Sequence, residues 1–121
     1  MKTFELMLCG LLALGGLAHL GGTLAGYDAG TEVFAWSISA SAFVLTIVFL
    51  HLVRIGRPRD RPIAAGAIIT KLVWVAIALA FGHAIGNIAA PRVVMHVVVA
   101  LALVATASFG WRSAGGSALK V

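Results

Sequence analysis

The stretch RIGRPRDRP, residues 54–62, separates two long apolar segments and holds four arginines and two prolines. Proline interrupts helices, and arginine is unfavourable in the hydrocarbon of a bilayer. The stretch therefore predicts a turn outside the membrane between two spans. Because Lys and Arg next to membrane helices mark the cytoplasmic side, it also predicts the direction in which the flanking helices run.

Four apolar segments extend outward from this stretch, and each is close to the ~20 residues that a helix needs to cross a bilayer. The breaks between them carry turn residues, with Thr31 as a candidate helix cap and Pro91 as a candidate first helical residue. We therefore predict an all-α, integral membrane protein, an up-down-up-down bundle of four transmembrane helices. A single membrane domain is expected over residues 1–121, with helices at about 4–26, 33–53, 63–88 and 93–110.

The composition supports membrane insertion over solubility. Hydrophobic residues make up 61% of the chain and charged residues 11%, against roughly 25% charged residues in a soluble domain. The net charge of +5 does not predict nucleic-acid binding, because no basic stripe is interleaved with aromatic residues. The lipid bilayer is the expected environment, and Cys9, as the single cysteine, permits no internal disulfide.

The distribution of Lys and Arg predicts the orientation. One side of the bundle holds most of them, and the other holds Arg92, near Asp28 and Glu32. The positive-inside rule then predicts a multi-pass protein of a bacterial-type inner membrane, with both termini cytoplasmic. The predicted inner set is Lys2, Arg54, Arg57, Arg59, Arg61, Arg112 and Lys120, with Trp111 as an inner interfacial anchor and Tyr27 and Trp36 as outer ones.

Three ionisable residues within or beside the spans receive interfacial interpretations. Lys71 lies about 12 Å beyond Pro62 along a helix and is expected to extend its ammonium to the inner surface; a buried functional lysine is the alternative. Glu5 is interpreted as an interfacial carboxylate near Lys2, and His51 as an interfacial residue beside Arg54.

Small residues spaced four apart predict close helix packing, within the bundle or between copies of the chain. The pairs are Gly22 with Gly26, Gly82 with Gly86, and Ser37 with Ser41.

Each predicted helix carries one histidine, and three of the four fall in the same outer layer. By helix rise, His19, His83 and His96 lie roughly 6–10 Å beneath the outer surface. Polar groups at membrane depth usually face the bundle interior, and residues four apart share a helix face. The sequence therefore predicts an outer-layer pocket lined by His19, Thr23, His83, Asn87, Arg92 and His96.

The chemistry of such a pocket has several possible forms. His19 or His83 opposite His96 is a ligand set for a b-type haem, with Arg92 near a propionate. The same three histidines are candidate ligands for a transition metal such as Cu or Zn, and a small lipophilic ligand is a further option. The hypothesis is an accessory or binding subunit, acting as a homo-oligomer or with other membrane subunits.

Two other hypotheses stay open. A small homo-oligomeric transporter or channel with proton coupling would use Glu5 or the histidines, and a purely structural subunit would use the histidines for packing alone. We expect no catalytic residues, because the chain contains no nucleophile-elbow, zinc-protease or nucleotide-binding motif. The size and four-helix plan resemble those of small multidrug transporters and DoxX-type proteins, but the chain has no acid midway along its first helix, as the transporters require.

Overall fold

The computed structural model describes the backbone of residues 1–116 and the side chains of residues 1–109. The helices are α1 (Lys2–Gly26), α2 (Glu32–Gly56), α3 (Arg61–Ala84) and α4 (Pro91–Gly116). Residues 1–116 contain no β-strand, and the four helices are long and apolar enough to cross a membrane. The all-α class and the four membrane spans are therefore confirmed.

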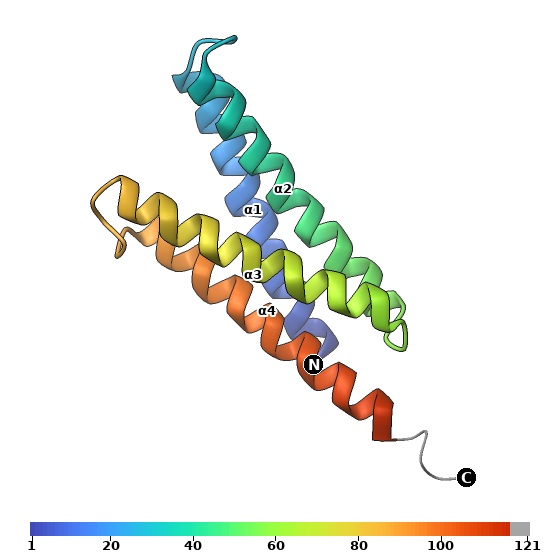
Figure 1. Ribbon diagram of the computed structural model, residues 1–121. Helices are drawn as coiled ribbons and strands as arrows, with labels where there is room; N and C mark the ends of the chain where they lie inside the picture. Colours follow the sequence, from blue (N-terminus) through green and yellow to red (C-terminus); the bar gives the residue numbers. More distant parts are fainter. Residues whose placement is uncertain (117–121) are drawn as a thin grey trace.

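The helices form two antiparallel hairpins that cross each other (Figure 1). The first hairpin is α1–α2 and the second is α3–α4, while α2 also packs on α3 and α1 on α4. The hairpins meet at the end that contains Met1 and the 57–60 turn, which we call the joined end. They diverge toward the end that contains the 27–31 and 85–90 turns, which we call the open end.

The helices begin where the sequence supplies caps. The side-chain oxygen of Thr31 accepts a hydrogen bond from the amide of Phe34 at 3.3 Å, and that of Asp60 accepts one from Ile63 at 3.1 Å. Each cap satisfies an amide that has no partner within its own helix. The fourth helix begins at Pro91, so the predicted roles of Thr31 and Pro91 are confirmed.

The third helix ends four residues before its predicted end, at Ala84 and not at Ile88. Gly86 has a φ of 70°, in the left-handed region that glycine adopts readily. The amide of Gly86 donates to the carbonyl of His83 and the amide of Asn87 to that of Gly82, both at 2.9 Å. This pair of bonds is a Schellman motif, which ends the helix. The prediction that His83 and Asn87 share a helix face is therefore wrong.

The remaining observed helix ends also differ from the predicted ones, except at Gly26, where the first helix ends as predicted. The second helix spans Glu32–Gly56 where 33–53 was predicted, and the fourth continues to Gly116, past the predicted residue 110. The predicted roles of the side chains of Trp111, Arg112 and Lys120 lie outside the described residues.

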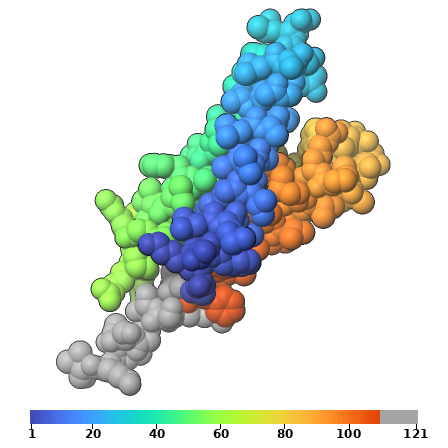
Figure 2. All heavy atoms as spheres, turned by 180° about the vertical axis from the view of Figure 1, so that it is seen from behind, coloured from blue at the N-terminus to red at the C-terminus, as the bar shows by residue number. Residues whose placement is uncertain are grey.

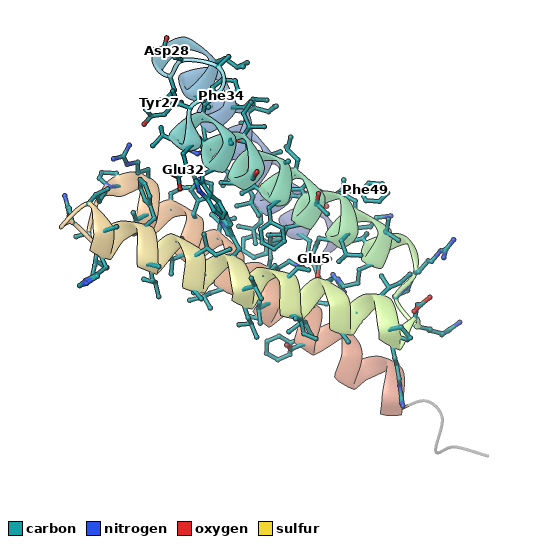
Figure 3. The ribbon with its side chains drawn as sticks, turned by 45° about the horizontal axis from the view of Figure 1, so that its top comes forward. Glu5, Tyr27, Asp28, Glu32, Phe34 and Phe49 are labelled. Atoms are coloured by element: carbon teal, nitrogen blue, oxygen red, sulfur yellow. The ribbon has the colours of Figure 1, made fainter. Side chains whose placement is uncertain are left out.

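The core is a small apolar layer between the hairpins. Leu12, Ile47 and Leu103 are fully buried, and Trp74 packs beside them. Large apolar side chains such as Phe49 cover the outside, where Figure 3 shows Phe49 projecting from α2. This inversion is expected of a chain whose surface meets lipid.

Close helix approach uses Gly82, from one of the predicted pairs, where a Cβ atom would lie 3.1 Å from Val93 Cγ1 of α4, and it also uses Gly15 and Gly16, which lie outside those pairs. A Cβ atom on Gly16 would lie 2.9 Å from Val44 Cγ1, and one on Gly15 would lie 3.0 Å from His96 Cε1. A Cβ on Gly22 or Gly26 would meet no atom within 4 Å. The Gly22–Gly26 pair therefore does not mediate packing within the described bundle, and its use between copies of the chain stays a prediction.

Candidate functional site

Four ionisable side chains from three helices are buried together toward the joined end of the bundle. Glu5 comes from α1, His51 and Arg54 from α2, and Lys71 from α3. The exposed fractions are 4% for Glu5, 0% for His51, 5% for Arg54 and 0% for Lys71. We call these four residues the charged cluster. Figure 3 shows Glu5 inside the bundle, behind α3 in that view.

Glu5 and Arg54 form the shortest contact of the charged cluster. Arg54 Nη2 donates a hydrogen bond to Glu5 Oε2 at 2.7 Å. Glu5 lies in the first turn of α1 and Arg54 in the last turn of α2. Each charge therefore also suits the dipole of its own helix. The Glu5 carboxylate faces another helix and not solvent, and its position at the membrane interface stays a prediction.

His51 connects to both members of this pair through one nitrogen. Its Nε2 lies 3.4 Å from Arg54 Nη2 and 3.9 Å from Glu5 Oε2. A guanidinium has donors only, so the shorter contact assigns Nε2 as an acceptor and puts the ring proton on Nδ1. The His51 side chain is fully buried within the bundle, and its position at the membrane interface likewise stays a prediction.

Lys71 completes the charged cluster from the third helix. Its ammonium donates to the backbone carbonyl of Ala67, and it interacts electrostatically with Glu5, Arg54 and His51. The expectation that Lys71 extends to the membrane surface is wrong, because its side chain is fully buried; of the alternative, a buried functional lysine, the burial is confirmed and the function stays a prediction. Lys71 is buried because it lies on the face of α3 that packs inside the bundle. That face consists of Ala64, Ala67, Lys71, Trp74, Ala78 and Gly82.

The spacing of small residues in the sequence indicates which face of α3 is buried. Alanines and a glycine recur at steps of three or four around Lys71, which is the period of one helix face. Glu5 shares its buried face with Leu8, Leu12 and Gly16. Hydrophobicity does not reveal these faces, because α1 and α3 also carry large apolar residues on their exposed sides, such as Leu14 and Ile69.

The predicted outer-layer residues are mostly exposed. His19, His83, Asn87 and Arg92 are exposed, Thr23 is buried and His96 is partly buried. Thr23 Oγ1 donates to the carbonyl of His19 at 2.8 Å, which is a bond within α1. Arg92 lies over the ring of Phe81, 5.2 Å from its centroid. Thr23 and Arg92 thus have partners close by in the structure.

His96 is the outer-layer histidine that makes contacts between helices. Trp74 Nε1 donates to His96 Nδ1 at 3.4 Å, and the two rings meet edge to face with centroids 5.4 Å apart. His96 also interacts electrostatically with His19. The structure therefore brings His96 and His19 into electrostatic range across α4 and α1, and puts His83 at the end of α3.

The divergence of the hairpins explains why the outer layer is not enclosed. Figure 2 shows the tips at the 27–31 and 85–90 turns standing apart, with the surface notched between them. Within the part of the chain that the structure describes, no three His, Cys, Asp or Glu side chains are grouped to hold a metal ion. Haem or metal ligation by His19, His83 and His96 stays a prediction.

Neither models of known protein families, nor curated proteins, nor solved structures match this chain. The function is therefore argued from the charged cluster and the shape of the bundle alone.

Proposed function

We propose that the protein is a small proton-coupled membrane transporter, with the charged cluster as its coupling site. The observation that carries this proposal is the burial of Glu5 against Arg54, His51 and Lys71, from three different helices. A carboxylate among cations inside a membrane bundle is a group that can exchange a proton for an ion pair. Protonation of Glu5 would release Arg54, and deprotonation would restore the pair.

Energetics argue against a purely structural role for these residues. Removing two charges from water costs several kcal/mol per ion, and apolar side chains of similar volume often pack in their place without loss. Polar contacts between membrane helices stabilise by only about 0.6 kcal/mol on average. A scaffold would be at least as stable with apolar residues at these positions, so the charges fit a functional site better.

The shape of the bundle supports alternating exposure of the site. The charged cluster lies toward the joined end, and Leu12, Ile47 and Leu103 lie in the apolar layer next to it. The hairpins separate toward the open end (Figure 1). Rocking of one hairpin against the other about this layer would open the joined end and close the open end.

The test is proton flux through the purified protein in vesicles with an imposed pH gradient. We expect the wild-type chain to dissipate the gradient and Glu5→Gln to reduce the rate to that of protein-free vesicles. Glu32→Gln is the matched control, because Glu32 is an exposed acid that accepts a hydrogen bond from Trp36 Nε1. Equal rates for Glu5→Gln and wild type would overturn the proposal.

A pair exchange separates a coupling role from a structural one. The double variant Glu5→Leu/Arg54→Met keeps the volume of the contact and removes both charges. We expect it to fold and to conduct no protons. Full proton flux in this variant would show that the charges serve packing alone.

A further inference from the structure

The charged cluster holds more positive charge than negative charge. Glu5 contributes the single carboxylate, while Arg54 and Lys71 contribute two cationic groups, and each of the three is at most 5% exposed. A buried charge without a counter-ion is strongly unfavourable in a low-dielectric interior. Because Arg54 already pairs with Glu5 at 2.7 Å, the unbalanced charge is that of Lys71.

Unpartnered hydrogen-bond donors accompany this charge. Among the described residues, His51 Nδ1 and Arg54 Nε are buried without a partner. The contact of His51 Nε2 with Arg54 makes Nδ1 the protonated nitrogen of that ring, so both unpartnered atoms are donors.

Lys71 adds further unused donors. Its Nζ has three N–H groups when charged, and within the described chain the carbonyl of Ala67 is the one partner that its ammonium finds. The charged cluster therefore has excess cationic charge and excess donors, and both are satisfied by the same chemistry, a negatively charged acceptor.

We propose that the charged cluster binds a singly charged anion beside Lys71, with Lys71, His51 and Arg54 as donors. One negative charge balances the four side chains when Glu5 is ionised and His51 is neutral. In that state a doubly charged anion would leave an excess of negative charge, and protonation of Glu5 adds to the attraction for the anion. This proposal rests on the proposed function and deepens it: the anion is the species whose movement the proton on Glu5 accompanies, and together the two carry no net charge.

Two sources supply such a group. One is a small soluble anion such as chloride or acetate, and the other is the phosphodiester headgroup of an anionic phospholipid. Their shared chemistry is a single negative charge that accepts hydrogen bonds. The experiment therefore includes an arm for each source.

The experiment measures thermal unfolding of the purified full chain in neutral detergent at constant ionic strength. Sodium chloride and sodium acetate are compared with sodium gluconate, whose anion is much larger. Saturable binding to the folded state would shift the unfolding equilibrium about a hundredfold when the anion is at 100 times its Kd. We expect chloride or acetate to raise the unfolding temperature saturably, and gluconate to leave it unchanged.

The lipid arm uses nanodiscs of phosphatidylcholine with and without phosphatidylglycerol. Saturable stabilisation by phosphatidylglycerol alone would support the anion site and identify a headgroup as its source. Stabilisation by chloride or acetate in pure phosphatidylcholine would identify a soluble anion. No saturable response to any of these probes would overturn the proposal.

Variants connect the response to Lys71. Lys71→Gln removes the charge, Lys71→Arg keeps it, and Lys2→Gln is the matched control at an exposed lysine. We expect the anion response to disappear in Lys71→Gln and to persist in the other two. A response retained in Lys71→Gln would overturn the proposal; if that variant does not fold, His51→Leu, which removes the Nδ1 donor, provides the same comparison.

The outcomes also separate this proposal from the proposed function. Proton flux that depends on Glu5, without an anion response, would leave the transporter proposal standing and remove the anion site. An anion response without proton flux would leave the anion site standing and remove the transporter proposal.

Discussion

Arg54 Nη2 lies 2.7 Å from Glu5 Oε2. This ion pair joins the start of α1 to the end of α2. Glu5 is in the first turn of α1 and Arg54 in the last turn of α2, at the opposite end from the 27–31 turn that connects the two helices. The covalent turn and the ion pair thus hold the hairpin at both ends. Lys71 and His51 add charge and hydrogen-bond donors at the same location.

Breaking the Glu5–Arg54 pair from one side should destabilise the fold more than removing both charges. Glu5→Gln leaves Arg54 and Lys71 buried without a carboxylate, and loss of one member of a buried pair costs about 3–5 kcal/mol. Glu5→Gln/Arg54→Gln should recover most of this loss. Reversible unfolding in mixed micelles measures the free energy of unfolding. A double variant as unstable as Glu5→Gln would show that the unpaired charge is not the cause of the loss.

Replacing Lys71 by an apolar residue of similar shape should stabilise the protein. Lys71→Met removes an ammonium that is fully buried, and it keeps an unbranched side chain in the same space. We expect a higher unfolding temperature in gluconate buffer and loss of proton flux in vesicles. Lys2→Met, at an exposed position, should change neither quantity. A lower unfolding temperature for Lys71→Met would show that the ammonium stabilises the bundle.

Adding a methyl group at two glycines of α1 should have different effects on the unfolding temperature. In a helix, Gly→Ala on its own stabilises by about 0.5–1 kcal/mol. At Gly16 the new Cβ would lie 2.9 Å from Val44 Cγ1, whereas at Gly22 nothing lies within 4 Å. Gly16→Ala should therefore lower the unfolding temperature of the monomer. Gly22→Ala should leave it unchanged or raise it, unless Gly22 packs against a second copy.

Comparing Gly22→Ala with wild type also tests the predicted homo-oligomer. Loss of an oligomer in Gly22→Ala, measured by light scattering of the detergent complex, would assign Gly22 and Gly26 to an interface between copies. An unchanged oligomeric state would remove that role.

The orientation predicted from Lys and Arg can be tested with one cysteine at each end. Cys9 is 3% exposed and is first replaced by alanine. Ala29→Cys lies in the exposed 27–31 turn and Pro58→Cys in the exposed 57–60 turn, and neither changes a charge. With both termini cytoplasmic, a membrane-impermeant maleimide should label residue 29 in intact cells and residue 58 after permeabilisation. The reverse pattern would show an inverted protein.

The sequence alone determined which segments are helices and where most of them begin. Four apolar segments of membrane length predicted four helices, and Thr31 and Pro91 marked two of their starts. These are local properties, because a helix in lipid satisfies its backbone within its own segment. The error at Ala84 is local too: the Gly86 turn ends α3 earlier than hydrophobicity predicts.

The tertiary structure decided which face of each helix is buried, and with it the candidate site. The prediction from depth placed the site among the histidines of the open end, and the structure buries Glu5, His51, Arg54 and Lys71 toward the joined end. Depth follows from counting residues along a span, but facing depends on how the hairpins cross. In a helix whose lipid side and core side are both apolar, hydrophobicity cannot distinguish the two faces. The crossing of the hairpins, and not polarity, placed Lys71 inside, where its ammonium donates to the carbonyl of Ala67 in its own helix.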